Sequence, residues 1–132
     1  MNLFLLGWSA ERRVDPAEAE SALRRLLDRL PFFPGRPVET WHAPSGALAA
    51  AWVVHGPEQT GGVGYVHTER ERLALFAGRP IRWSGEREAD GRGPLDPSAY
   101  LEPADRWADT LDGRFAAARY EDASRTLEVA SD

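Results

Sequence analysis

The chain has 132 residues, of which 42% are hydrophobic, and this length and composition predict one globular domain over residues 1–132. Its 21 acidic and 16 basic residues give a net charge of -5, which argues against a nucleic-acid partner. Every basic residue is arginine and cysteine is absent, which excludes P-loop and Schiff-base lysines, disulfides, thiol catalysis and cysteine metal sites.

The N-terminal part of the chain predicts a strand and then a helix. Residues 3–8 are largely apolar, but this run is too short for a signal peptide or a membrane span and has no basic leader, so we expect a cytoplasmic location and no membrane partner. A helix is predicted over residues 15–30, because Asp15 can cap it, Pro16 suits the first helical position and apolar residues recur at helical spacing up to Leu30.

Several strands follow. Residues 38–42 and 47–55 predict a hairpin about the Pro44-Ser45-Gly46 turn, and the second strand is apolar almost throughout, so we expect it to be covered on both faces. Residues 65–67, 72–77 and 80–83 predict three more strands, the first preceded by a glycine-rich loop at residues 61–64.

The last third of the chain predicts a loop, a short helix and a final hairpin. Residues 84–97 are polar and rich in glycine and proline, which is typical of an exposed loop. Pro103 opens a predicted helix whose apolar residues run at helical spacing to Leu111, with Gly113 as its cap. Residues 115–120 and 126–130 predict two paired strands. Together these elements indicate an α+β fold with two stacked, mainly antiparallel sheets flanked by helices.

Two segments of the sequence resemble a known family. Residues 111–120 read LDGRFAAARY and are followed by a turn and LEVASD at 127–132, which resembles a late segment of the N-terminal glutaminase domain of asparagine synthetase. Residues 73–81, LALFAGRPI, resemble the strand of that family that leads to an Asn-Gly-Glu-Ile stretch. The resemblance implies an Ntn-hydrolase-like αββα fold of the class II glutamine amidotransferase type, truncated at the C-terminus because the last strands of the family domain are missing.

The catalytic residues of that family do not carry over to this chain. The nucleophilic cysteine position is Asn2, which has no thiol or hydroxyl, and a large second residue also disfavours removal of Met1. The Asn-Gly pair that supplies oxyanion donors reads Ala77-Gly78 here. We therefore expect no catalytic residue, with Asn2, Ala77 and Gly78 as vestigial positions.

Two arginines flank the vestigial pocket. Arg79 and Arg82 are candidate carboxylate-binding residues, because guanidinium groups bind carboxylates through two parallel hydrogen bonds. The alternative, which we favour, is that both are solvated or paired with acids such as Glu86, since exposed arginines are common.

The resemblance also implies a function. Nucleophile-less domains of this kind occur in β-lactam synthetases and lasso peptide cyclases, where a second domain adenylates a carboxylate with ATP and Mg. The Ser-Gly-Gly-rich loop of that domain is absent here, so we expect no cofactor in this chain and a synthetase domain or partner chain that binds ATP. The expected role is structural, within an ATP-dependent amide-bond-forming enzyme of peptide natural product biosynthesis. The alternative is a stand-alone module that binds a peptide or protein through the vestigial pocket or an open sheet edge.

Other patterns carry weaker functional hypotheses. His42, His55 and His67 could form a zinc site of a hydrolase, but each lies near the end of a separate strand with no short-spaced ligand pair, so we expect no metal. Among the tryptophans, Trp52 and Trp107 are expected in the core, whereas Trp41 and Trp83 fit either face of a strand.

Overall fold

Two antiparallel sheets and one helix make up most of the described structure. The computed structural model describes residues 2–30, 35, 37–54, 66–78, 81–82, 101–103, 111–112 and 115–131. In chain order the elements are β1 (Asn2–Trp8), α1 (Pro16–Leu27), β2 (Glu39–His42), β3 (Leu48–Val54), β4 (Val66–Thr68), β5 (Arg72–Gly78), β6 (Ile81–Arg82), β7 (Leu111–Asp112), β8 (Phe115–Glu121) and β9 (Thr126–Ser131).

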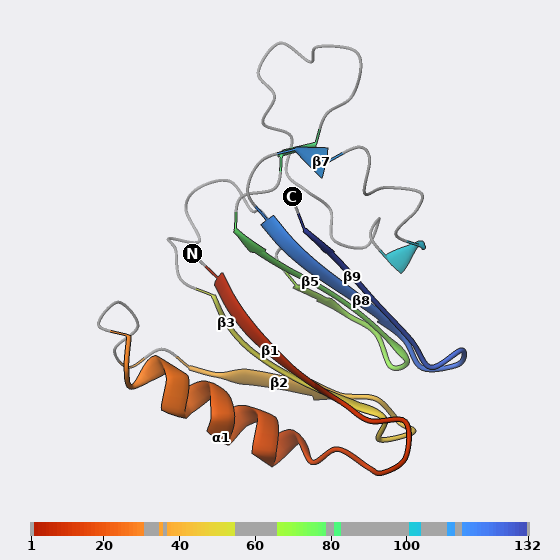
Figure 1. Ribbon diagram of the computed structural model, residues 1–132, viewed down its shortest axis with the longest axis horizontal. Helices are drawn as coiled ribbons and strands as arrows, with labels where there is room; N and C mark the ends of the chain where they lie inside the picture. The colour runs from red at the N-terminus through yellow and green to blue at the C-terminus, as the bar shows by residue number, and fades with distance from the viewer. Residues whose placement is uncertain are drawn as a thin grey trace.

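The two sheets are stacked. The first, called sheet A, has the strand order β1-β3-β2, and the second, sheet B, has the order β4-β5-β8-β9, while β6 and β7 form a separate short pair. Figure 1 shows three layers in the described part of the chain: α1 lies on one face of sheet A, and sheet B lies on the other. The predicted α+β class with two stacked antiparallel sheets is confirmed.

Helix α1 begins where the sequence predicts and ends earlier. The Asp15 side chain caps it by accepting a hydrogen bond of 2.9 Å from the Ala17 backbone N–H. The predicted end at residue 30 is wrong, because the helix ends at Leu27. The backbone tightens after that residue: Leu30 donates to the Leu27 carbonyl, three residues back, at 2.9 Å. The proline that follows Leu30 disfavours helical geometry at this position, which explains the earlier end.

Strand β3 is buried on both faces, as predicted. Its odd-numbered residues pack with Ala19, Leu23 and Leu27 of α1, and its even-numbered residues face sheet B. The two sets are Ala49, Ala51 and Val53 toward the helix, and Leu48, Ala50 and Trp52 toward sheet B. Alanine at three consecutive positions lets both neighbouring layers approach the strand closely.

The core between the sheets settles the orientation of one tryptophan. Trp41 packs against this core, its ring lies edge-on to Tyr120 with 6.1 Å between ring centroids, and its indole N–H donates to the Glu69 carbonyl at 2.9 Å. Trp52 is buried here, as expected. Trp83 and Trp107 lie outside the described residues.

The prediction of a helix from Pro103 to Leu111 is wrong at its C-terminal end. Leu111 and Asp112 form β7 and pair with β6, with Arg82 opposite Leu111. Pairing with a strand distant in sequence has overridden the local helical spacing. Pro103, its predicted first residue, is not helical in the structure. Residues 104–110, the 84–97 loop, the 61–64 loop, His55 and Gly113 lie outside the described residues.

The other predicted strands are found with small shifts in their ends. Both predicted hairpins, β2 with β3 and β8 with β9, are antiparallel pairs in the structure. Strand β5 extends to Gly78, the described part of the strand predicted at 80–83 is β6, and β4 begins at Val66. Within the described residues, no helix combines the length and apolar character needed to cross a membrane.

The helix-to-sheet core gives a first prediction. Replacing Leu23, which is fully buried against β3, with alanine should lower the free energy of unfolding by about 2–5 kcal/mol, because a cavity forms where the side chain was. Leu26 on the same helix is 41% exposed, so Leu26→Ala should cost less than about 1 kcal/mol. Urea denaturation followed by circular dichroism measures both. Equal losses would contradict the packing of this face.

Candidate functional site

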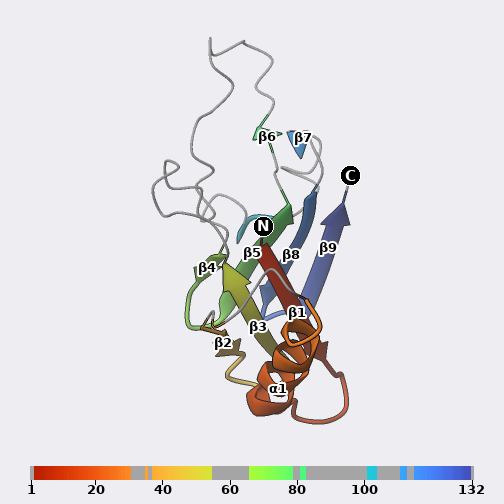
Figure 2. The same ribbon diagram turned by 90° about the vertical axis from the view of Figure 1, so that its left-hand side faces the viewer.

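The vestigial positions come together at one end of the stacked sheets. Figures 1 and 2 both show that β1 begins beside the end of β5. In the sheet registers, Asn2 lies opposite Val54 and Gly78 lies opposite Phe115. Asn2, Ala77 and Gly78 are therefore at the same end of the sandwich. None of these three residue types is a nucleophile.

The candidate carboxylate-binding arginines are only partly covered by the structure. Arg82 belongs to β6, where its backbone pairs with Leu111, and Arg79 lies outside the described residues. The described part of this end therefore consists of the beginning of β1, the end of β5 and the short β6–β7 pair that contains Arg82.

At the opposite end of the sandwich, a hydrogen-bonded cluster joins the two sheets. The sequence did not indicate this cluster. The Asp122 carboxylate accepts three hydrogen bonds: from the Ser45 backbone N–H at 2.9 Å, from the Ser45 hydroxyl, and from the Tyr120 hydroxyl at 2.8 Å. Ser45 lies in the β2–β3 turn of sheet A, and Asp122 lies in the β8–β9 turn of sheet B. We call these residues the Ser45–Asp122–Tyr120 cluster. It connects the two sheets directly.

Hydrogen bonding controls the ionisation of this cluster. Burial alone would raise the pKa of Asp122, but the hydrogen bonds from the Ser45 hydroxyl and backbone and from Tyr120 outweigh it and lower the pKa below 3.8. The pKa of the Tyr120 hydroxyl is raised, first by its burial and then by its hydrogen bond to Asp122. The carboxylate is therefore ionised and saturated with donors. The Ser45 hydroxyl donates to this carboxylate and also accepts from the Ala47 N–H at 3.1 Å, so it links the Asp122 turn to its own turn.

A glycine shapes the turn that carries Ser45. Gly46 has a φ of 77°, a left-handed conformation that other residues rarely adopt. Its carbonyl accepts from the Val14 N–H at 2.7 Å, and the neighbouring Ala47 carbonyl accepts from the Ser9 N–H at 2.9 Å. The segment between β1 and α1 is thus tied to the same turn as Asp122.

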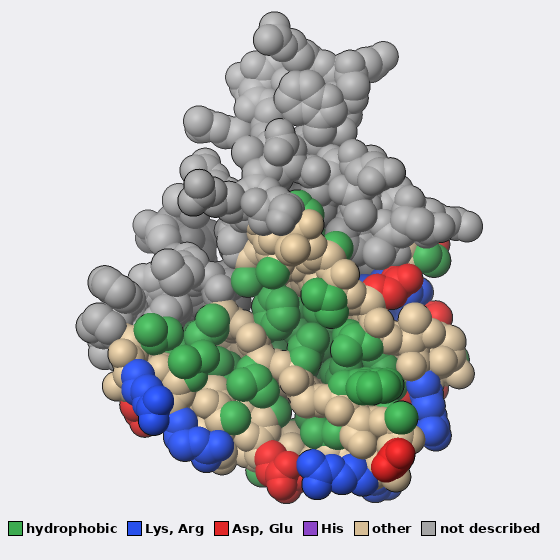
Figure 3. Space-filling model, viewed as in Figure 1, with side chains coloured by type: hydrophobic (Ala, Val, Ile, Leu, Met, Phe, Trp, Pro, Cys, Tyr) green, Lys and Arg blue, Asp and Glu red, His purple; other side chains and the backbone are tan. Residues whose placement is uncertain are grey.

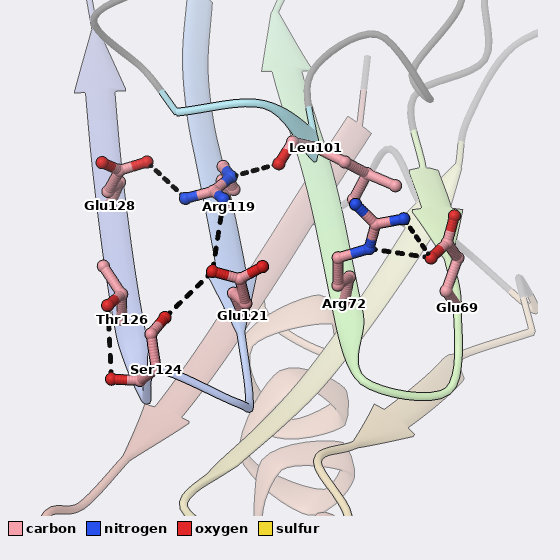
Figure 4. Close-up of polar contacts among 8 residues, drawn as sticks. All are labelled: Glu69, Arg72, Leu101, Arg119, Glu121, Ser124, Thr126 and Glu128. Atoms are coloured by element: carbon pink, nitrogen blue, oxygen red, sulfur yellow. Dashed lines mark hydrogen bonds and ion pairs between the residues drawn. The ribbon is translucent and has the colours of Figure 1, made fainter.

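A buried arginine lies on the outer face of sheet B. Arg119 is only 6% exposed and pairs with Glu128 on β9 at 2.8 Å and with Glu121 at 3.7 Å. Its Nε donates to the Leu101 carbonyl, and Figure 4 shows the guanidinium between Glu128 and Leu101. All three guanidinium nitrogens have partners, so Arg119 fixes Leu101 against the sheet and is not available for a ligand.

The histidines do not converge in the described structure. His42 is exposed on β2 of sheet A, and His67 lies on β4 of sheet B, where its Nε2 is 3.5 Å from a Glu69 carboxylate oxygen. His55 lies outside the described residues. Across the described ranges, no group of three or more His, Cys, Asp or Glu side chains could hold a metal ion.

One side of the sandwich exposes apolar residues between two sheet edges. Strand β1 is an edge of sheet A and β9 is an edge of sheet B, and Figure 2 places both away from β2 and β4. We call this the open side. Its apolar residues on the facing strand surfaces are Phe4, Leu6, Leu127 and Val129. Figure 3 shows hydrophobic side chains gathered over β1 and β9, with charged side chains along the lower and right-hand margin.

A pocket adjoins the same edge strand on the helix side. It has a volume of about 280 Å³ and lies between the end of β1, the segment that follows and the first turn of α1. The lining residues are Leu5, Gly7, Trp8, Ser9, Arg12, Val14, Glu18 and Ala19. Trp8 is 50% exposed, so its indole is accessible from this pocket.

Comparisons with family models, with curated proteins and with solved structures found no match to this chain.

The Ser45–Asp122–Tyr120 cluster predicts a pH dependence of stability. Because the folded pKa of Asp122 is lowered, its ionised form stabilises the fold above its ordinary pKa of 3.8, and this contribution is lost as the pH falls through the lower folded pKa. In Asp122→Asn the free energy of unfolding should fall less steeply with decreasing pH than in the parent chain, since no carboxylate is left to protonate at this position. Ser45→Ala should also make this decrease less steep, because it removes a hydrogen bond that lowers the pKa of Asp122. Urea midpoints measured across the acid range test this, and unchanged slopes in both variants would contradict it.

Proposed function

We propose that this chain is a non-catalytic, glutaminase-like domain that acts by binding a partner. The partner would be the synthetase part of an asparagine-synthetase-like, ATP-dependent amide-bond-forming enzyme, of the β-lactam synthetase or lasso peptide cyclase type. The resemblance of residues 111–120 and 73–81 to that family motivates the enzyme class. The two stacked antiparallel sheets with a helix on the outer face of sheet A supply three of the four layers of the αββα arrangement that this class implies.

The open side is the observation that carries the binding role. Val129 is 68% exposed, although its neighbours on the same face of sheet B, such as Ala118, are buried. Val129 lies beside the partly buried Phe4, Leu6 and Leu127 and beside two sheet edges that have no partner strand among the described residues, and accessible apolar residues next to such edges are typical of protein-binding surfaces.

The end of the sandwich that contains Asn2, Ala77 and Gly78 supports the non-catalytic role. The first residue of β1 lies beside the end of β5, where an Ntn-type enzyme would need a nucleophile next to oxyanion donors. Asn2 supplies no nucleophile, and a backbone N–H from Gly78 without one stabilises no intermediate. ATP and Mg would bind the synthetase, and the amide-forming chemistry would take place there. We expect the assembly in the cytoplasm, where ATP is available.

A second candidate function is a stand-alone peptide-binding module. The pocket of about 280 Å³ beside β1 favours it, because it combines an edge strand, an exposed indole and the Arg12 guanidinium. The two functions differ in what the chain binds. Size-exclusion chromatography with light scattering, with and without an asparagine-synthetase-like chain encoded beside it, would separate them: a stable complex supports the first, and a monomer that binds only short peptides supports the second.

The lack of a nucleophile gives a third prediction. Incubation of the purified chain with glutamine should release no glutamate above a blank, because Asn2 cannot form an acyl intermediate. Asn2→Ala is the matched control and should behave identically. Glutamate release by the parent chain that disappears in Asn2→Ala would overturn the non-catalytic assignment.

A further inference from the structure

The two sheets differ in width, and the difference lies on the open side. Sheet A has three strands and sheet B has four. Residues of β9 that face sheet A become more exposed along the strand: Leu127 is partly buried against the core between the sheets, whereas Val129 is 68% exposed. The described part of sheet A therefore does not extend far enough to cover β9. Among the described residues, the inner face of β9 around Val129 is uncovered and the second edge of β1 has no partner strand.

The edges on the open side lack the features that normally protect sheet edges. Strand β1 reads NLFLLGW and has no charged residue over its seven positions. Strand β9 reads TLEVAS, and its one charged side chain, Glu128, is paired with Arg119 on the outer face. The edges on the other side are short: β2 has four residues, including Glu39, and β4 has three. Natural sheets prevent edge pairing with short strands and charges, so of the four edges in the described sheets those of β1 and β9 are the better suited to pairing.

These observations define the space that an occupant must fill. Its floor is the inner face of β9 with Leu127 and Val129, and its wall is the free edge of β1, whose backbone groups can form a ladder of hydrogen bonds. The pocket lined by Leu5, Gly7 and Trp8 adjoins the helix side of the same strand. A strand added to β1 would have one face against β9 and the other toward this pocket.

We propose that β1 accepts an extended segment of a partner polypeptide as a fourth strand of sheet A. The segment is uncharged, because β1 presents no charge for it to pair with, and has an apolar residue at alternate positions to cover Val129. The proposal rests on the partner-binding part of the proposed function and specifies how the partner binds. It does not depend on the chemistry of that partner.

The difference in width disfavours a second copy of the chain as the occupant. If two copies paired β1 with β1, the uncovered β9 of each would occupy the space of sheet B in the other copy. If they paired β9 with β9 instead, a gap about two strands wide, roughly 10 Å, would stay open in sheet A between the two β1 edges. A single added strand satisfies the edge of β1 and covers β9 at the same time.

A fusion tests the site with a defined probe strand. Seven residues of alternating valine and threonine, the length of β1, are attached to the C-terminus of the full chain through a glycine-serine linker. A linker of about fifteen residues spans roughly 20 Å and allows both strand directions. Hydrogen exchange of the β1 amides is the readout, with the urea midpoint as a second measure. The control fusion has lysine in place of each valine.

The expected result is protection of alternate β1 amides by at least about tenfold in the valine fusion and not in the lysine fusion. Val129→Lys in the valine fusion should remove this protection, because a charge then lies under the added strand. Thr68→Lys, which puts the same charge on the exposed Thr68 of β4 at the opposite edge, should leave it unchanged. Both variants change exposed positions, and circular dichroism would check that they fold.

Two results would overturn the proposal. One is equal exchange of the β1 amides in the valine and lysine fusions. The other is an unfused chain that is a dimer by light scattering with its β1 amides already protected, which would assign the site to a second copy. Neither result bears on glutamine turnover. Conversely, glutamate release would overturn the non-catalytic assignment and leave the strand site standing.

Discussion

The hydrogen-bonded carboxylate of Asp122 is the interaction on which the arrangement of the two sheets depends. It joins the turn of the β2–β3 hairpin to the turn of the β8–β9 hairpin, and the Asp122 N–H also donates to the Glu71 carbonyl in the β4–β5 turn at 2.8 Å. One end of the sandwich is therefore fixed by three turns. At the other end no such cluster occurs among the described residues. Exposure along the inner face of β9 increases with distance from the Asp122 turn, from the partly buried Leu127 to Val129, which is 68% exposed.

Small residues explain how the layers approach one another elsewhere. Ala49, Ala50 and Ala51 of β3 are fully buried, which brings α1 and sheet B close to the two faces of one strand. Gly7 of β1 acts similarly, because a Cβ at this position would lie 2.9 Å from a Val14 methyl group. These contacts cover only part of the helix-facing side of β1, because the pocket beside Leu5, Gly7 and Trp8 is accessible. The edge strand is held firmly by β3 and α1 while its other edge has no described neighbour.

Local patterns predicted the elements, and the contacts between distant residues did not follow from them. The helix start at Asp15 and the two hairpins could be predicted because their signals lie within a few residues of each other. The end of the helix at Leu27 and the strand at Leu111 were mispredicted, because backbone tightening before a proline and pairing with β6 override periodicity. The bond between Ser45 and Asp122 joins residues 77 positions apart, which no spacing rule detects. The final hairpin predicted a strand at residues 126–130 but not that Val129 on its inner face is exposed.

The placement of charge connects the buried arginine to the open side. A glutamate at the middle of an edge strand would ordinarily discourage pairing, yet Arg119 holds Glu128 on the outer face of sheet B at 2.8 Å. The same guanidinium binds the Leu101 carbonyl, so its position is fixed from two directions. Successive side chains of a strand point to opposite faces, so Leu127 and Val129 lie on the face of β9 opposite Glu128 and are the large side chains there. The charge of Glu128 is paired with Arg119 on the outer face. A partner strand that lies against β9 therefore meets an apolar surface, and the negative net charge of the chain does not oppose its approach there.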